Sequence, residues 1–360
     1  MTPAELSRAV LSTVRRAVAA DELRVPVPDR ISVQRPPRPG CGDYATNVAL
    51  QLAGAAGCPP REVAEVLRKR LATEPGIAQV VIAGPGFLNI TLDTAAYGDV
   101  VRKVLERGAA YGHGDSLAGT YVTPVHDGEP RAAVTAEVLE RLLHACGAKG
   151  GAKVGANTGA EGPADPASPA APAPAPEPEP APEPVSVRPA GATAAQLCEL
   201  LGPDAARWAL LRPPADDTPS LDPAVLLSQR AGNPLFRVRY AHARSRALLR
   251  NAHDLGIEPS SDASDGTFHH PAETDLLGLI ADYPRVVETA ARHRAPDRVA
   301  RHLERLADAF LRFHDECPPL PRGDEKPLAA HRVRLSLAEA TGTVLAGGLD
   351  LLGISAPEHL

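Results

Sequence analysis

The spacing of apolar positions predicts a mixed α+β domain in the first part of the chain. Stretches with helical periodicity alternate there with short strand-like stretches, and two of the strands flank the turn Gly84-Pro85-Gly86. The predicted elements are, in chain order, helices at 6–18 and 61–71, strands at 79–82 and 87–92, a helix at 94–108, a strand at 120–125 and a helix at 132–146.

After residue 194 the pattern becomes helical almost throughout. Proline and glycine interrupt it at intervals, for example at Gly202-Pro203 and at Pro284, and each interruption predicts the end of a helix. This arrangement is typical of an all-α helical bundle. The predicted helices are 194–201, 204–212, 222–230, 234–255, 272–281, 284–293, 296–316 and 326–352.

A segment of unusual composition, residues 147–193, separates these two parts. It is rich in Gly and Ala at first and consists of Pro-Ala-Pro-Glu repeats from Pro163 to Pro184. Proline lacks a backbone donor, and alanine offers little surface to bury, so we expect a disordered Pro/Ala-rich linker. A binding site for a proline-recognising domain is the alternative. The predicted fold class is therefore multidomain α+β: a small α+β N-terminal domain, this linker and a C-terminal all-α helical bundle.

Charge and cysteine content narrow the possible functions. The 360 residues carry a net charge of -6, and residues 195–360 alone contain 19 basic and 23 acidic side chains. A nucleic-acid site would therefore have to be a local patch of arginine. The five cysteines are odd in number and lack metal-ligand spacing, which indicates reduced thiols in a cytoplasmic protein without a metal site. Neither a signal peptide nor a membrane span is expected, and no cofactor is implied.

One predicted helix carries a candidate RNA-binding face. Asn233-Pro234 is a strong helix start, and Arg237, Tyr240 and Arg244 follow on one face. A second face carries Arg239, Arg246 and Arg250. Guanidinium groups pair with phosphates and an exposed aromatic ring can stack on an unpaired base, so this combination suits RNA. The alternative is a solvated arginine face with Tyr240 in the core.

Several motifs in the C-terminal part resemble one known family. In order along the chain they are Gly202-Pro203-Asp204-Ala205-Ala206-Arg207, Asn233-Pro234-Leu235-Phe236, Tyr240-Ala241-His242-Ala243-Arg244 and Gly348-Leu349-Asp350-Leu351-Leu352-Gly353-Ile354-Ser355-Ala356-Pro357-Glu358. Together they resemble the DALR-type anticodon-binding helical bundle of arginyl-tRNA synthetases. The resemblance covers residues 194–360 and implies tRNA, in particular arginine tRNA, as the partner.

The N-terminal part resembles the appended N-terminal domain of the same enzymes. Gly42-Asp43-Tyr44-Ala45-Thr46-Asn47 and Gly84-Pro85-Gly86-Phe87-Leu88-Asn89 carry this resemblance. In that family the domain contacts the tRNA elbow, which implies that Phe87 and Asn89 bind tRNA. The alternative is a tight turn with Phe87 buried. The implied domains are 1–118 for the N-terminal domain, 119–146 for a remnant of the catalytic domain, 147–193 for the linker and 194–360 for the bundle.

The catalytic signatures of the family are degenerate in this chain. The Pro-x-His-x-Gly-His motif corresponds to Pro124-Val125-His126-Asp127-Gly128-Glu129, in which His126 and Gly128 remain and Glu129 replaces the second histidine. Carboxylates at about 4–6 Å would oppose triphosphate binding by a few kcal/mol each. Pro130 is expected to disrupt the following helix. The Lys-Met-Ser-Lys-like loop would fall at 185–191, where Arg188 is the single cation. A metal site at Asp127 and Glu129 is an alternative without an evident third ligand.

The predicted function follows from what the family resemblance lacks. Only 38 residues separate Cys146 from Val185, too few for a nucleotide-binding sheet. We therefore predict a non-catalytic arginyl-tRNA synthetase-like protein that binds tRNA. The alternatives are a regulatory subunit that docks on a true synthetase without binding RNA, and an arginine–tRNA ligase whose core another chain supplies. Where the family has an aromatic residue, Gln, Asn and Met, this chain has Arg237, Arg239, Gly347 and Leu360, which implies relaxed anticodon readout.

Overall fold

The N-terminal domain is a three-stranded antiparallel sheet packed against helices. The computed structural model describes residues 1–34, 36, 41–150, 153–154, 181–260 and 268–360. Strand order in this sheet is β1-β3-β2, and α1 and α2 join α3 in forming the helical layer. The elements are α1 Pro3–Ala19, β1 Tyr44–Thr46, α2 Val48–Ala56, α3 Pro60–Leu71, β2 Ile77–Ala83 and β3 Phe87–Leu92. The sequence predicted all of them except β1 and α2.

Local sequence explains how this domain begins and turns. The side chain of Thr2 accepts a hydrogen bond from the Glu5 backbone N–H, and the Glu5 carboxylate accepts one from Thr2, so a capping box starts α1. The turn between β2 and β3 brings Gly86 against the first residue of α3. A Cβ at position 86 would lie 3.0 Å from Pro60, and its φ of +151° is disfavoured for residues other than glycine.

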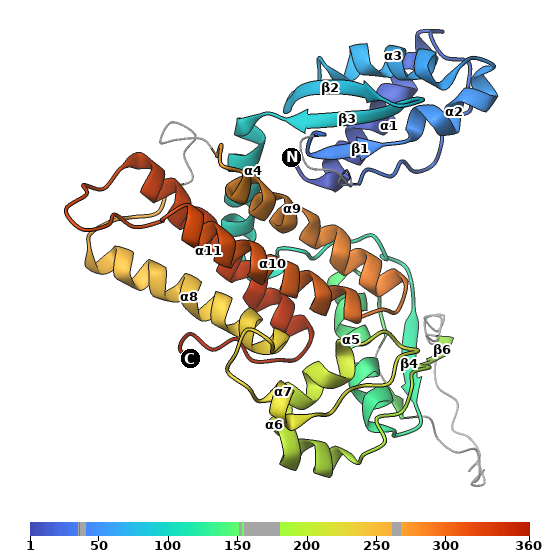
Figure 1. Cartoon of the computed structure of the whole chain (residues 1–360). Coiled ribbons are helices and arrows are strands. Elements are labelled where there is room, and N and C mark those ends of the chain that lie inside the picture. Colours follow the sequence, from blue (N-terminus) through green and yellow to red (C-terminus); the bar gives the residue numbers. More distant parts are fainter. Residues whose placement is uncertain (35, 37–40, 151–152, 155–180, 261–267) are drawn as a thin grey trace, which may run out of the picture.

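A helix, α4 (Thr94–Arg107), connects the N-terminal domain directly to the rest of the molecule (Figure 1). It continues without a break in the described chain into η1 (Gly108–Ala110) and packs against α9 and α11 of the bundle. Lys103 on α4 also forms an ion pair with Glu5 on α1 at 2.5 Å. The N-terminal domain is thus attached through α4, and the attachment does not pass through the predicted linker.

The predicted catalytic remnant belongs structurally with the bundle. Strand β4 (Val122–His126) leads into α5 (Pro130–Ala145), which packs against α6 and α9. The prediction that residues 119–146 fold together with the N-terminal part of the chain is therefore wrong. The reason is burial: Leu139, Leu142 and Leu143 need apolar partners, and those partners come from helices far along the chain. Figure 1 shows α5 and β4 beside α6, at the opposite end of the molecule from the N-terminal domain.

The segment predicted as a linker is structured at both described ends. Strands β5 (Lys153–Val154) and β6 (Ala181–Pro184) pair in parallel with β4, in the order β5-β4-β6. A Cβ at Gly150 would clash with the Val122 carbonyl oxygen, because the backbone at Gly150 lies directly against β4. The predicted disordered linker at 147–193 is therefore wrong for 147–150 and 181–193. Its central part, 155–180, lies outside the described residues.

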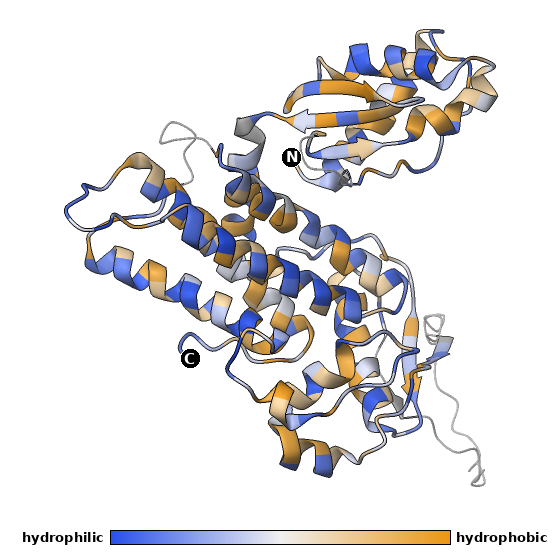
Figure 2. Ribbon diagram, in the orientation of Figure 1, coloured by the Kyte–Doolittle hydropathy of each residue, from blue (hydrophilic) through white to orange (hydrophobic). Residues whose placement is uncertain are grey.

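The C-terminal bundle is all-helical, as the sequence predicted, but its described residues form six helices and not the eight expected, because α6 and α9 each span two predicted helices. In Figure 2 hydrophilic and hydrophobic residues alternate along these helices, as expected for amphipathic helices with one buried face. The large residues buried at their contacts include Leu276, Ile280, Leu303, Phe310, Phe313 and Leu349. The helices are α6 Ala194–Leu211, α7 Pro223–Leu226, α8 Pro234–Asp254, α9 Pro271–Arg292, α10 Asp297–Glu316 and α11 Ala329–Leu351.

One predicted helix break did not occur, because a side chain from elsewhere replaces the missing hydrogen bond. Gly202 does kink α6, with φ of 71° and ψ of 169°. Pro284, in contrast, lies inside the continuous helix α9. Proline cannot donate to the carbonyl four residues earlier, which is that of Ile280. The buried hydroxyl of Tyr111 donates to that carbonyl at 3.1 Å, so the break predicted at 284 is wrong.

Candidate functional site

Helix α8 starts at a cap that also fixes the preceding loop. The Asn233 side-chain oxygen accepts hydrogen bonds from the backbone N–H groups of Leu235 and Phe236 at 3.1 and 3.4 Å. Its Nδ2 donates to the carbonyls of Leu226 and Ser228 at 2.8 and 2.9 Å. One buried amide therefore sets both the start of α8 and the position of the chain leaving α7.

The arginines on α8 form two rows that face different neighbours. Arg237 and Arg244 face α10: Arg237 lies 3.2 Å from Asp308, and Arg244 donates to His314 at 3.2 Å. Arg246 faces the C-terminal tail and pairs with Glu358 at 3.1 Å. This division matches the two faces expected from helical spacing.

Arg239 is the most firmly held of these arginines. It pairs with Asp204 on α6 and also donates to the hydroxyl and carbonyl of Ser355. Burial opposes ionisation of Asp204, but hydrogen bonds from Ser355 and the charge of Arg239 outweigh it and hold the pKa of Asp204 below its ordinary value. Arg239 thus anchors the C-terminal tail to α6, which gives it a structural role that the sequence did not reveal.

Tyr240 lies between the two rows and is open to solvent. The residue is 41% exposed, and its ring stacks on Phe236 with centroids 5.8 Å apart and planes at 20°. The alternative that Tyr240 is a core residue is therefore wrong. A ring supported on one face and open on the other can receive an unpaired base.

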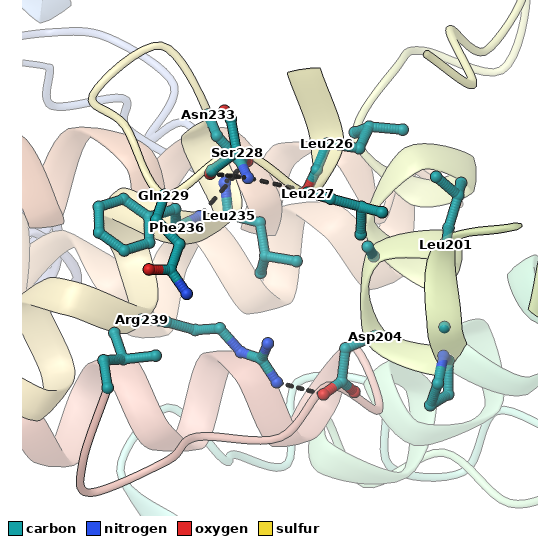
Figure 3. Close-up of a pocket in the computed structure, with 14 residues that line it drawn as sticks. Leu201, Asp204, Leu226, Leu227, Ser228, Gln229, Asn233, Leu235, Phe236 and Arg239 are labelled. Carbon is teal, nitrogen blue, oxygen red and sulfur yellow. Dashed lines mark hydrogen bonds and ion pairs between the residues drawn. The ribbon is translucent and has the colours of Figure 1, made fainter. Parts of the chain in front are cut away.

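A pocket of about 270 Å³ lies beside this surface, between α6, α7 and α8. Figure 3 shows Arg239 reaching across its floor to Asp204, with Phe236 and Gln229 on one side and Leu201 and Leu227 on another. Leu360, the last residue, also lines it. Its mixture of apolar walls and a charged floor is compatible with a planar polar group.

The two predicted residues of the N-terminal domain share one exposed face of β3. Phe87 is 42% exposed, so the alternative that it is buried is wrong. Asn89 is half-buried and lies on the same face, because side chains alternate along a strand. Val81, opposite Asn89 on β2, is 46% exposed and extends the surface. The structure does not bring this surface together with α8; the two lie on separate domains.

The degenerate signature, residues 124–129, forms the turn between β4 and α5, and hydrogen bonds within the chain hold this turn. His126 ends β4, and its Nδ1 accepts a hydrogen bond from the Gly128 N–H at 3.2 Å. Glu129 is the N-cap of α5: one carboxylate oxygen accepts from the Ala132 N–H at 2.8 Å and the other from the Ala190 N–H at 2.7 Å. Pro130 occupies the first helical position, where proline is favoured, so the expected disruption of the helix is wrong.

Arg131, next along α5, is the residue of this region whose role the sequence analysis missed. Its guanidinium is buried, with the residue 1% exposed, and it donates to backbone carbonyls. The acceptors are the carbonyls of Arg188, Leu210, Pro213, Pro214, Ala215 and Asp217. Arg188 donates in turn to the Asp216 carbonyl at 2.9 Å. Arg131 therefore holds several loops together and is closed to solvent, whereas Arg188 contacts the same loop and remains exposed.

Other site types find no support in the described residues. Within them, no group of three or more His, Cys, Asp or Glu side chains could hold a metal ion. All five cysteines are free thiols, and burial raises the pKa of Cys146 and of Cys317 to about 11. None of the helices described is long and apolar enough to cross a membrane.

Comparison with known proteins first defines a class. Residues 238–360 match the family described as "DALR anticodon binding domain", and residues 4–92 match "Arginyl tRNA synthetase N terminal domain". The fold is similar to that of Thermus thermophilus arginyl-tRNA synthetase, with a TM-score of 0.72, 15% identity and 100% of both chains covered. It is equally similar to Plasmodium falciparum arginyl-tRNA synthetase, with a TM-score of 0.73, 10% identity and 99% of both chains covered.

Sequence relatives then identify the family. An arginine–tRNA ligase from Frankia alni is 31% identical over 552 aligned positions, covering 100% of both chains. One from Pseudarthrobacter chlorophenolicus is 30% identical over 554 positions, again with 100% of both covered. The chain belongs to the arginyl-tRNA synthetase family. The alignment with the Frankia alni enzyme spans 552 positions, and this chain has 360 residues. At least 192 of those positions therefore contain no residue of this chain.

Proposed function

We propose that this protein binds tRNA, with arginine tRNA as the preferred partner, and does not activate arginine. The observation that carries the proposal is the position of Glu129. The N-terminus of a helix after a β-strand is a natural phosphate site, because its free N–H groups point outward. Here a carboxylate takes up the Ala132 N–H and binds Ala190 on the facing segment. A triphosphate would have to displace that carboxylate and tolerate its charge.

The size of the parallel sheet supports the same conclusion. Strands β5, β4 and β6 contain two, five and four residues. Arg131, the cation that follows the turn, donates all its hydrogen bonds to backbone carbonyls, and the Nε of Arg188 donates to the carbonyl of Asp216. The 192 or more unmatched alignment positions agree with the loss of a catalytic core. The result would be a catalytically inactive relative of a synthetase, and we place it in the cytoplasm with the tRNA pool.

Retention of tRNA binding is supported by two exposed surfaces. Tyr240 with Phe236 on α8, and Phe87 with Asn89 on β3, both present an aromatic ring to solvent. Tyr240 lies within the residues that match the DALR anticodon binding domain, and Phe87 and Asn89 lie within those that match the arginyl tRNA synthetase N terminal domain. The arginines of α8 could exchange their partners, such as Asp308 and Glu358, for phosphate oxygens.

A filter-binding titration with purified arginine tRNA, other tRNAs and a duplex DNA control tests this proposal. We expect saturable binding of tRNA at low salt and tighter binding of arginine tRNA. Tyr240→Ala should weaken binding by about 1–3 kcal/mol if a base stacks on the ring. Tyr121→Ala, which removes a partly buried tyrosine outside both surfaces, is the control and should bind like wild type. Absence of tRNA binding at low salt would leave the regulatory-subunit alternative in its place.

A further inference from the structure

A basic groove lies between α9 and α10, away from both surfaces described above. It has a volume of about 660 Å³, and Val286 is the one apolar residue among those that line it. The groove is also lined by two acidic residues, Asp297 and Glu304, and by Thr289. Its five arginines are Arg212, Arg285, Arg298, Arg301 and Arg305. Positive charge therefore gathers here on a bundle in which acidic residues outnumber basic ones.

Helical spacing explains why these side chains converge. Arg298, Arg301 and Arg305 are separated by three and four residues on α10, so they project from one face. Arg285 faces them from α9, and Arg212 lies just after the end of α6. The same spacing was visible in the sequence, but the partners from α9 and α6 were not.

Two of the five arginines have no counter-charge in the described residues. Arg212 pairs with Glu304 at 2.9 Å, Arg301 pairs with Asp297, and Arg285 lies 3.4 Å from Asp282. Arg298 and Arg305 are exposed, and no side-chain hydrogen bond or ion pair engages either of them within the part of the chain that is described.

Arg285 adds a further unsatisfied donor to the groove. Its Nε is buried and has no hydrogen-bond partner, although Nη2 contacts Asp282. A buried donor without an acceptor costs free energy that a ligand oxygen would recover. Arg237 on α8 also has a buried Nε without a hydrogen-bond acceptor, but that nitrogen lies 3.2 Å from the Asp308 carboxylate.

We infer that the groove binds phosphates of an RNA backbone. Arg298 and Arg305 are seven residues apart, about 10 Å along the helix axis, and an RNA strand carries one charged phosphate per nucleotide. A strand lying along α10 would therefore present a phosphate to each. A protein partner fits less well, since the groove offers no aromatic or large apolar anchor. The inference rests on the proposed function for the identity of the RNA as tRNA and adds a third contact region to it.

The test compares two doubly substituted proteins that lose the same charge. Arg298→Gln/Arg305→Gln removes the two uncommitted cations. Arg15→Gln/Arg322→Gln removes two exposed arginines, one on α1 and one in the loop after α10. The affinity for tRNA is measured by filter binding from 50 to 300 mM salt. We expect the groove variant to bind roughly tenfold more weakly at 50 mM salt and to have a slope shallower by about 1.4–1.8 in log K against log salt, and the control to change little.

Each other outcome has a distinct meaning. If wild type binds tRNA and the groove variant behaves like wild type or like the control, the groove is not a tRNA contact and the proposed function stands. If wild type does not bind tRNA, both proposals fall. A second experiment titrates sodium tripolyphosphate into wild type and into the groove variant and measures binding by calorimetry. If the variant no longer binds tripolyphosphate but binds tRNA as tightly as wild type, the groove is a site for small anions. That result would overturn the inference.

Discussion

At the scale of single residues, the carboxylate of Glu129 has a structural role at the start of α5. The motif resemblance predicts that Glu129 takes the place of the second histidine, and in the structure its carboxylate joins the N-terminus of α5 to the segment containing Ala190. Helix N-termini favour negative charge, so a glutamate at this position stabilises the fold. The same property makes it a poor neighbour for a phosphate. Stabilisation of the helix start and repulsion of a phosphate would therefore have one physical cause.

We expect Glu129→Ala to lower the free energy of unfolding by about 1–2 kcal/mol, because two N–H groups lose their acceptor. Urea denaturation followed by circular dichroism measures this. Glu199→Ala, an exposed glutamate on α6, is the control and should change stability by less than about 0.5 kcal/mol. Equal stability of the two variants would show that the Glu129 cap contributes nothing.

At the scale of elements, contacts from distant parts of the chain decide where the sequence misleads. Helix starts such as Asn233 and the kink at Gly202 are local events, and the sequence predicted them. The continuity of α9 through Pro284 depends on Tyr111, which lies more than 160 residues earlier and cannot be read from the local pattern. The partners of the α8 arginines, such as Asp308 and Glu358, also lie far from α8 in the sequence.

A double-mutant cycle tests the role of Tyr111 in α9. Tyr111→Phe should destabilise the protein by about 1–2 kcal/mol, because the Ile280 carbonyl loses its donor. Pro284→Ala supplies a backbone N–H at the position that bonds to Ile280. In the Pro284→Ala background, Tyr111→Phe should therefore cost less, and the two changes should not be additive. Strict additivity in urea unfolding would contradict this account.

At the scale of the whole molecule, α4 sets the relation between the N-terminal domain and the bundle. The sequence suggested two folded parts separated by a disordered linker at residues 147–193. Instead, α4 and the contact of Lys103 with Glu5 connect the domains, while β4, α5, β5 and β6 belong with the bundle. The architecture of each domain was predictable from periodicity. Their grouping was not, because it depends on which apolar faces cover α5.

Shortening the segment between β5 and β6 should therefore not affect tRNA binding. Deletion of residues 161–172 leaves 14 residues between the two strands, within the dozen or more that a parallel connection needs. We expect the tRNA affinity to stay within about twofold of wild type, because this segment does not set the distance between the binding surfaces. If the deletion variant binds tRNA clearly more weakly in filter binding while its thermal stability is unchanged, the segment between β5 and β6 contributes to tRNA binding and this expectation is wrong.

The measurement that most directly tests the central claim is arginine-dependent exchange of labelled pyrophosphate into ATP. It is made with the full chain, with arginine tRNA present, on protein purified to exclude host synthetase. Because the Glu129 carboxylate occupies the N-terminus of α5, we expect exchange no higher than that of a sample without the protein. The conditions are those under which tRNA binding is measurable. Exchange above this background that follows the protein through purification would contradict the account, because it would show that the chain activates arginine.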